Sequence, residues 1–339
     1  MKKVIALSLI AALFCTVAVF AGGGGQGGSG GGTHVFIPKS TGNPYFDKMW
    51  EGFQEAVRAA GGTPLQRAPD AATIEGQIRI IDQLIAQRVA SITISANDEY
   101  ALQPAITRAM QAGIKVISSD SATNPSSRMT HVNQAGVNEV GKTLIEAAFD
   151  LTGGSGEFAI LSATSTATNQ NAWIAVMQAE LTSNPKYSNL RLVQIAYGDD
   201  EPIKSTTETQ ALLSRFPNLK AIVAPTAAGV PAVARAVQDS RRDVKVTGLG
   251  LPSQMAEYIQ SGVAPYVFLW NPAELGYLSA YVAMALSAGA ITGSVGERFT
   301  AGRLGQYTIV QAGDNGTEII LGPPFRFDAS NIAEWRNVY

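Results

Sequence analysis

The 339-residue sequence contains a single cysteine, Cys15, and only two histidines, His34 and His131. Cys15 lies in an N-terminal apolar run that we expect to be removed, which excludes disulfides and thiolate chemistry from the mature chain. Neither histidine has a partner that the sequence brings close, and no nucleophile elbow, Walker A loop, dinucleotide fingerprint or metal-ligand cluster is present. The sequence therefore lacks the parts of an enzyme, and we expect neither catalysis nor a cofactor.

Charge is also scarce. Charged residues make up 15% of the chain and the net charge is −2, so nothing in the composition indicates nucleic acid or an anionic membrane surface as a partner. Apolar residues make up 46%, and the length is sufficient for two domains with separate cores. No extra apolar segment or coiled coil is visible, and we expect a monomer.

The N-terminus has the pattern of a targeting segment. Basic "MKK" is followed by an apolar run, and "VFA" before Gly22 fits a signal peptidase site, which predicts a signal peptide over residues 1–21 and export. An uncleaved anchor is the alternative, whereas Phe14 argues against lipidation of Cys15 because a small residue is required there. Residues 22–32, "GGGGQGGSGGG", predict a flexible linker that can act as a tether.

From residue 34 onward, short β-branched runs alternate with amphipathic helical patterns. Most of the runs are apolar throughout, as is typical of parallel strands that are buried on both faces. The expected strands are 34–38, 91–95, 115–119, 157–162, 191–196, 221–225, 245–250 and 266–270. The expected helices are 44–60, 72–88, 101–112, 136–150, 171–183, 203–215, 228–239, 253–261 and 273–289.

This alternation predicts an α/β protein with two doubly wound parallel-sheet lobes. We expect an N-terminal lobe of residues 33–132 plus about 266–298, and a C-terminal lobe of residues 133–265 plus about 299–339. The hinge would contain several crossovers, which we place in 131–134, in 262–272 and around 296–302.

Ligands bind at the carboxyl ends of the strands in such sheets, so the residues that follow each strand are candidates for the site. They combine one lysine, one carboxylate, several amides and flanking aromatic rings. Carboxylates and amides bind hydroxyl groups, and aromatic faces cover the C–H face of a sugar, so the pattern indicates a neutral polyol. The candidates are Lys39, Tyr45, Phe46, Asp120, Asn169, Gln170, Pro225, Ala227, Trp270 and Asn271.

Several of these residues have a structural interpretation as well. Lys39 can be a solvated loop residue, Asp120 an Asx-turn residue, and Asn169 the N-cap of the helix that follows it. Trp270 can belong to either the site or the core. Elsewhere, we expect Asp98 to cap a helix, "GDDEP" at 198–202 to start one, and Trp50 and Trp173 to lie in the core.

The same residues carry a resemblance to a known family. "PKSTGNPYF", "LSATSTATNQNAW", "VAPTAAGVPA", "TGLGLPSQM" and "LWNPAELGYL" resemble the periplasmic substrate-binding proteins of bacterial ABC importers with the type I, ribose-binding-like fold. The resemblance covers residues 33–339 and is strongest to the rhamnose-binding branch, which is similar to the autoinducer-2 receptors.

In those receptors the ligand is held by a lysine after the first strand, an aspartate, an Asp-Gln pair and a Pro-x-Ala turn. By motif these fall on Lys39, Asp120, Asn169 with Gln170, and Pro225 with Ala227. A further receptor aspartate falls on Asn271. Asn169 and Asn271 thus stand where the receptors have acids, and an amide donates as well as accepts. The exchange argues against autoinducer-2.

The resemblance implies an exported receptor that captures a small sugar, most strongly L-rhamnose, by lobe closure and delivers it to a membrane ABC permease. The first alternative is a receptor for autoinducer-2, or for another pentose or deoxysugar, with a signalling role. The effector domain of a LacI-type regulator has the same fold but needs an N-terminal helix-turn-helix, which residues 1–32 do not offer. A sugar-modifying enzyme is the remaining alternative, with no nucleophile or base pair in the sequence to support it.

Overall fold

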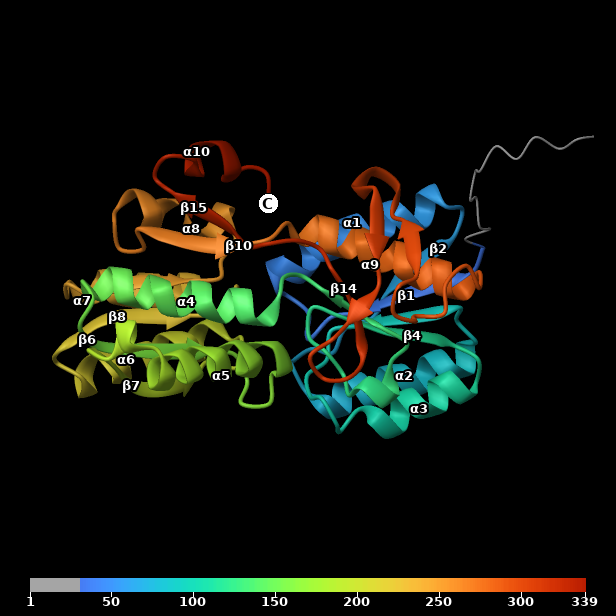
Figure 1. The fold of residues 1–339 in the computed structure, drawn as a ribbon, viewed down its shortest axis with the longest axis horizontal. Helices are drawn as coiled ribbons and strands as arrows, with labels where there is room; N and C mark the ends of the chain where they lie inside the picture. Colours follow the sequence, from blue (N-terminus) through green and yellow to red (C-terminus); the bar gives the residue numbers. More distant parts are fainter. Residues whose placement is uncertain (1–30) are drawn as a thin grey trace, which may run out of the picture.

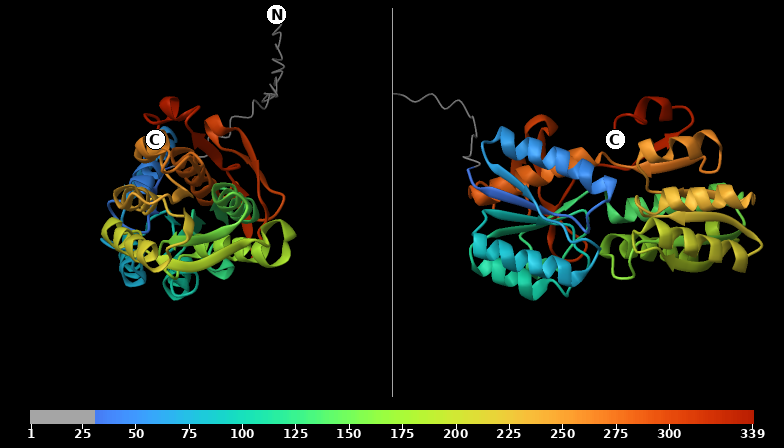
Figure 2. Two further views of the ribbon diagram at one scale, coloured as in Figure 1. Left: turned by 90° about the vertical axis from the view of Figure 1, so that its left-hand side faces the viewer. Right: turned by 180° about the vertical axis from the view of Figure 1, so that it is seen from behind.

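The computed structural model describes residues 31–339. The chain folds into two α/β lobes that lie side by side and meet at a narrow waist (Figures 1 and 2). The predicted signal peptide and nearly all of the predicted linker lie outside the described residues. Within residues 31–339, no helix has the length and apolar character needed to cross a membrane.

The N-terminal lobe contains a seven-stranded sheet in the order β13-β14-β5-β4-β3-β1-β2. Helices α1 and α9 pack together on one face of this sheet, and α2 and α3 pack together on the other (Figure 2). The strands are β1 Thr33–Ile37, β2 Thr63–Gln66, β3 Ser91–Ile94, β4 Lys115–Ser119, β5 His131–Asn133, β13 Val310–Gln311 and β14 Thr317–Ile320. The helices are α1 Pro44–Ala59, α2 Ile74–Gln87, α3 Gln103–Gln111 and α9 Pro272–Ser287.

The C-terminal lobe contains a four-stranded parallel sheet in the order β7-β6-β8-β9. The antiparallel pair β10-β15 extends it through a bridge between Leu249 and Phe268. The strands are β6 Gly156–Ser162, β7 Leu190–Tyr197, β8 Leu219–Ala224, β9 Lys245–Gly248, β10 Tyr266–Leu269 and β15 Phe325–Asp328. The helices are α4 Val137–Thr152, α5 Thr168–Ser183, α6 Pro202–Arg215, α7 Val230–Ser240, α8 Pro252–Gln260 and α10 Ile332–Trp335.

All eight strands predicted from apolar runs are present. Seven of them lie in the two large sheets, and the eighth, β10, pairs antiparallel with β15. The apolar runs did not predict two short strands of the N-terminal sheet, β2 and β5. β2 contains Pro64, which is tolerated because this strand lies at the edge and pairs with β1 alone. β5 has only three residues, which is too short for a recognisable pattern.

The expected lobe boundaries need correction in their C-terminal part. β10, expected in the N-terminal lobe, pairs with β15 and the C-terminal sheet. β13 and β14, expected in the C-terminal lobe, extend the N-terminal sheet because β14 pairs in parallel with β5. The antiparallel pair β11 Arg298–Thr300 and β12 Gln306–Thr308 precedes them.

The described chain therefore crosses between the lobes after β5, after β10 and after β14. The first two crossings fall at or next to the expected segments 131–134 and 262–272. The third, expected around 296–302, instead lies between Ile320 and Phe325, in the segment "LGPP".

Helices α1 and α9 approach each other unusually closely. A Cβ atom added at Gly276 of α9 would lie 1.8 Å from the carbonyl oxygen of Met49, and one added at Gly52 of α1 would lie 1.8 Å from that of Ala273. The two glycines therefore permit contact between the helix backbones. Asn43 is the N-cap of α1 and accepts from the Tyr45 amide, which fixes where the helix begins. This cap and the close contact with α9 together set the position of the first turn of α1.

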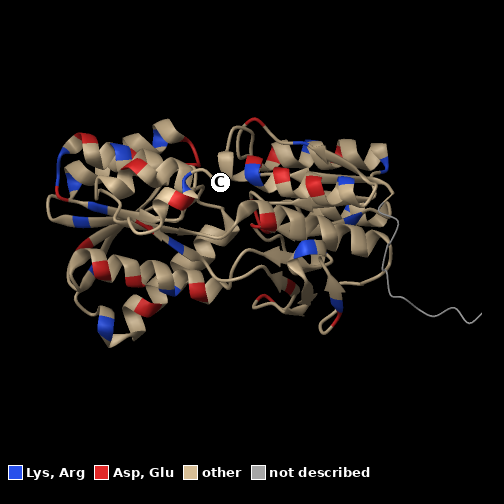
Figure 3. Ribbon diagram, turned by 90° about the horizontal axis from the view of Figure 1, so that it is seen from above, with Lys and Arg blue, Asp and Glu red and all other residues tan. Residues whose placement is uncertain are grey.

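Lysine, arginine, aspartate and glutamate are interspersed along the helices of both lobes (Figure 3). In this view neither lobe presents a face of one sign. The distribution agrees with the small net charge of the sequence.

Candidate ligand-binding site

The strand ends of both lobes meet around one cavity. Its free volume is about 30 Å³, because the side chains of the two lobes are drawn together around it. Nine of the ten predicted site residues line it: Lys39, Tyr45, Phe46, Asp120, Asn169, Gln170, Pro225, Ala227 and Trp270. Carboxyl ends of parallel strands thus converge here as the sequence pattern predicted.

Lys39 follows β1 and spans the two lobes. Its side chain is buried, and Nζ donates to Asn169 Oδ1 at 3.0 Å and to Gln170 Oε1 at 3.1 Å, both at the start of α5. A solvated loop lysine is thereby ruled out. Because both amide oxygens face the ammonium, the amide nitrogens of Asn169 and Gln170 are left as donors for other groups.

The loop that carries Lys39 is held by Asn97, which the sequence analysis did not include among the site residues. The Asn97 amide donates to the carbonyl oxygens of Lys39 at 3.0 Å and of Thr73 at 3.2 Å. The Asn97 carbonyl in turn accepts from Thr166 Oγ1 of the C-terminal lobe at 2.9 Å. Asn97 is a positioning residue that also links the lobes.

Asp120 follows β4 and is the buried carboxylate of the cavity. It accepts from Ser95 Oγ at 2.7 Å and from the Tyr45 hydroxyl at 3.1 Å. Its side chain is engaged by these two hydrogen bonds and does not form an Asx turn. Its φ of 66° is strained for a residue other than glycine and directs the carboxylate into the site. Burial raises its pKa, against the opposing effects of the Lys39 charge and of the two hydrogen bonds.

Aromatic rings form the apolar wall. Trp270 Nε1 donates to the Tyr45 hydroxyl at 2.7 Å, and the two rings meet edge to face with centroids 6.4 Å apart. Burial and the neighbouring Asp120 charge raise the pKa of Tyr45, so its hydroxyl stays protonated and can donate. Trp173 was predicted to lie in the core and is only 2% exposed, yet its ring lies 5.9 Å from Trp270 and lines the cavity as well.

Asn271, the tenth predicted residue, is not among those that line this cavity. Its side chain caps α9, with Oδ1 accepting from the amides of Ala273 at 3.0 Å and Glu274 at 3.3 Å. The prediction that Asp98 caps a helix is wrong, because its carboxylate accepts from the amides of Tyr100 and Ala101 in the turn before α3, whose N-cap is Leu102. Asn169 is not the N-cap of α5, since Ala167 holds that position.

Asp200 is a cavity residue that the sequence analysis missed. It lies in the turn after β7, with a left-handed φ of 57°, and accepts from the Thr226 hydroxyl. The signal was available, because "GDD" follows a predicted strand, but these acids were interpreted only as the start of α6. The cavity therefore presents a second carboxylate, on the C-terminal lobe.

Together these groups can bind a small neutral molecule that carries several hydroxyl groups. Two carboxylates accept, Lys39 and the amide nitrogens donate, and the rings of Tyr45, Trp173 and Trp270 cover apolar atoms. No group of histidine, cysteine, aspartate and glutamate within residues 31–339 has the arrangement of a metal site.

A family model described as periplasmic binding protein domain matches residues 34–291. The chain belongs to this family. A solved ABC transporter solute-binding protein from Clostridium phytofermentas, with bound L-rhamnose, is 48% identical, and the match covers 91% of this chain and 99% of that one with a TM-score of 0.89.

Two other matches are more distant. The D-ribose/D-allose-binding protein of Pseudomonas aeruginosa is 26% identical over 63% of this chain and 69% of its own length. LsrB from Clostridium saccharobutylicum, solved with AI-2, is 22% identical with a TM-score of 0.84, over 89% of this chain and 99% of that one. At that identity the likeness concerns the fold alone.

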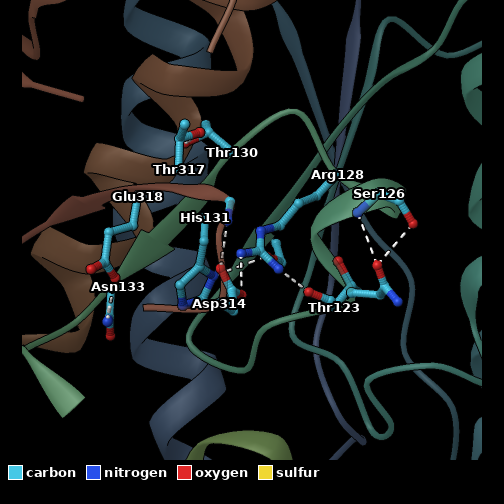
Figure 4. A network of polar contacts seen from close by, with 12 residues as sticks. Thr123, Ser126, Arg128, Thr130, His131, Asn133, Asp314, Thr317 and Glu318 are labelled. Carbon is cyan, nitrogen blue, oxygen red and sulfur yellow. Dashed lines mark hydrogen bonds and ion pairs between the residues drawn. The ribbon is translucent and has the colours of Figure 1, made fainter. Parts of the chain in front are cut away.

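His131 begins β5 of the N-terminal lobe, outside the lining of the cavity, and lies beside Arg128 and Asp314 (Figure 4). Nδ1 is 2.9 Å from the Ser118 hydroxyl. Burial, and then the positive charge of Arg128, lower the pKa of this imidazole to about 3, although Asp314 acts in the opposite direction. The folded protein therefore holds His131 neutral at neutral pH.

The low pKa of His131 should make the stability of the protein depend on pH. Only the unfolded state protonates His131 between its ordinary pKa of about 6.5 and the folded value of about 3. The stability that neutral His131 contributes is fully present above the ordinary pKa. As the pH falls between the two pKa values, this contribution to the free energy of unfolding is lost by ~1.4 kcal/mol per pH unit. We expect the His131→Gln variant to lose less stability than the native protein between neutral and acidic pH, measured by denaturant unfolding. Parallel curves would contradict the assignment.

Proposed function

We propose that this protein is the extracytoplasmic substrate-binding component of a sugar ABC importer, and that its ligand is L-rhamnose. The observation that carries the proposal is the cavity itself, in which Lys39 and Asp120 of one lobe face Asn169 and Gln170 of the other between aromatic rings. The 48% identity to a solute-binding protein with bound L-rhamnose supports the choice of sugar.

Binding would proceed by lobe closure. A sugar between Lys39 and the amides of α5 contacts both lobes, so it binds the closed state better than the open state and shifts the population toward closure. The closed face would then be presented to a membrane permease. The proposal includes export, a tether formed by the glycine-rich linker, a monomeric protein and no catalytic step; nucleic acid has no role in it.

The test is a calorimetric titration of the mature protein with L-rhamnose, after unfolding and refolding to remove any sugar carried through purification. We expect a one-site isotherm with a Kd in the micromolar range, or about −8 kcal/mol. D-ribose, D-arabinose and autoinducer-2 serve as competitors. No heat with rhamnose would refute the sugar assignment, and saturable binding of autoinducer-2 in its place would establish the signalling alternative.

A pair of asparagine variants tests the residues behind this choice. Asn169→Asp places a carboxylate beside the Lys39 ammonium and removes an amide donor, so we expect rhamnose affinity to fall by about tenfold or more. Asn271→Asp is the matched control, because this residue caps α9 outside the cavity and aspartate is an equally good cap. Equal effects of the two substitutions would remove Asn169 from the ligand contacts.

A further inference from the structure

A second and larger space lies beside the sugar site, between the lobes. We call it the chamber; its walls come from β5, the start of α4, the loops around Tyr100 and Asp314, and the start of α5. Its volume is about 870 Å³, and it opens to solvent. Asp120, Asn169 and Trp173 line both the sugar site and the chamber, so the two spaces adjoin at these side chains.

The chamber is present while the lobes are already in contact. Lys39 reaches Asn169 and Gln170, and Thr166 reaches the Asn97 carbonyl, so both sides of the site are joined. Closure around the sugar site therefore leaves this adjoining space open. Its size exceeds what a single sugar ring fills.

Buried polar groups in the chamber wall have no partner among the described residues. Gln134 is 0% exposed, and neither its amide oxygen nor its amide nitrogen makes a hydrogen bond. Thr168 Oγ1 is likewise buried and unpaired. Buried polar groups are nearly always hydrogen-bonded in folded proteins. These groups lack a partner within the described chain, which a ligand hydroxyl supplies once the chamber wall shifts to expose them.

The remaining wall favours a neutral sugar ring. Tyr100, at the rim, has 62% of its surface exposed and offers an aromatic face for the C–H side of a pyranose. The charge of the chamber wall is mainly negative. Asp98, Glu99, Asp314 and Glu318 all line it, and its Arg128 is paired with Asp314 (Figure 4). An acidic substituent would be repelled here.

We propose that the protein binds L-rhamnose that carries a second, neutral glycosyl unit, with the rhamnose ring in the cavity and the second ring in the chamber. The hydroxyls of the second ring bond to Gln134 and Thr168, and its apolar face lies on Tyr100. The inference rests on the proposed rhamnose site and extends its ligand class from monosaccharides to neutral disaccharides.

Calorimetric titration of the mature protein with four sugars tests this inference. The probes are L-rhamnose, the neutral disaccharides rutinose and galactosyl-rhamnose, which carry rhamnose at opposite ends, and acidic galacturonosyl-rhamnose. We expect at least one neutral disaccharide to bind within about tenfold of rhamnose, and the acidic one to bind at least about tenfold more weakly than its neutral counterpart.

Variants locate the second ring. Tyr100→Ala and Gln134→Leu are expected to weaken the disaccharide by about five- to tenfold while rhamnose affinity is kept. Phe325→Ala, an exposed ring outside the chamber, is the control and changes neither affinity. Binding of rhamnose but of neither neutral disaccharide would overturn this inference and leave the proposed function intact, whereas failure of rhamnose overturns both. Disaccharide binding that neither variant weakens would also overturn it.

Discussion

Asp120→Asn is expected to weaken rhamnose binding by about a hundredfold and, at the same time, to stabilise the sugar-free protein at neutral pH. The affinity falls because the variant loses hydrogen bonds between sugar hydroxyls and a charged acceptor, which are worth about 1.5–3 kcal/mol. The stability rises because the native carboxylate is buried, and burial of its charge outweighs the help from Lys39, Ser95 and Tyr45, as its raised pKa indicates.

The pH dependence has a definite sign. Because the pKa of Asp120 is raised on folding, the native state holds this proton more tightly than the unfolded state, and stability falls as the pH rises from the ordinary aspartate pKa through the folded value. The advantage of the Asp120→Asn variant should therefore grow over that window and stay constant above it.

Calorimetric titration and denaturant unfolding measure the two effects on the same samples. Asp239→Asn, which alters a carboxylate that is 73% exposed, is the control and should change neither quantity. Unchanged rhamnose affinity in Asp120→Asn would remove Asp120 from the site. A loss of stability at neutral pH would show that its hydrogen bonds outweigh the burial of its charge.

Gly276→Ala is expected to destabilise the protein by about 3 kcal/mol. In an ordinary exposed helix position the same change stabilises by up to about 1 kcal/mol, so the sign is reversed here. The new methyl group would meet the Met49 carbonyl, which is backbone and cannot rotate away, so α1 and α9 must separate. Because Tyr45 lies in the first turn of α1 and Trp270 lies two residues before α9, separation also disturbs the sugar site, and we expect weaker rhamnose binding.

Denaturant unfolding of Gly276→Ala beside Gly313→Ala tests this expectation. Gly313 has open space where its Cβ would lie, so that control should stay within about 0.5 kcal/mol of the native protein. Gly52→Ala should resemble Gly276→Ala, since its methyl group would meet the Ala273 carbonyl at the same helix contact. A Gly276→Ala variant as stable as the control would show that α1 and α9 can separate with little loss of free energy of unfolding.

Much of the fold was predictable because its central strands are buried on both faces and therefore leave continuous apolar runs. The sequence did not indicate which sheet a late strand joins. β10 has a clear strand pattern, but its partner β15 lies at the far end of the chain. β14 follows an "NG" turn typical of a local hairpin, yet it also pairs in parallel with β5, and no local pattern encodes that contact.

The site was predictable to the extent that strand ends specify it. Lys39, Asp120 and Asn169 were found because each follows a buried run and carries a polar group. Asp200 was missed, and Asn271 was predicted at the site although its side chain caps α9, for the same reason: an acid or amide between a strand and a helix can either cap the helix or face the ligand. Backbone dihedrals decide between these roles, and the left-handed turn that directs Asp200 inward has no clear sequence signature.

The pairing of β5 with β14 has a consequence for how the protein is made. The N-terminal sheet cannot be completed until the chain has been synthesised as far as Ile320, although β1 to β5 are made early. The segment from α4 to β9, in contrast, contains a whole parallel sheet with its helices. Contacts between distant segments slow folding. The four-stranded sheet of the C-terminal lobe is therefore expected to form before the seven-stranded sheet is complete, although the first strands of the seven-stranded sheet leave the ribosome earlier.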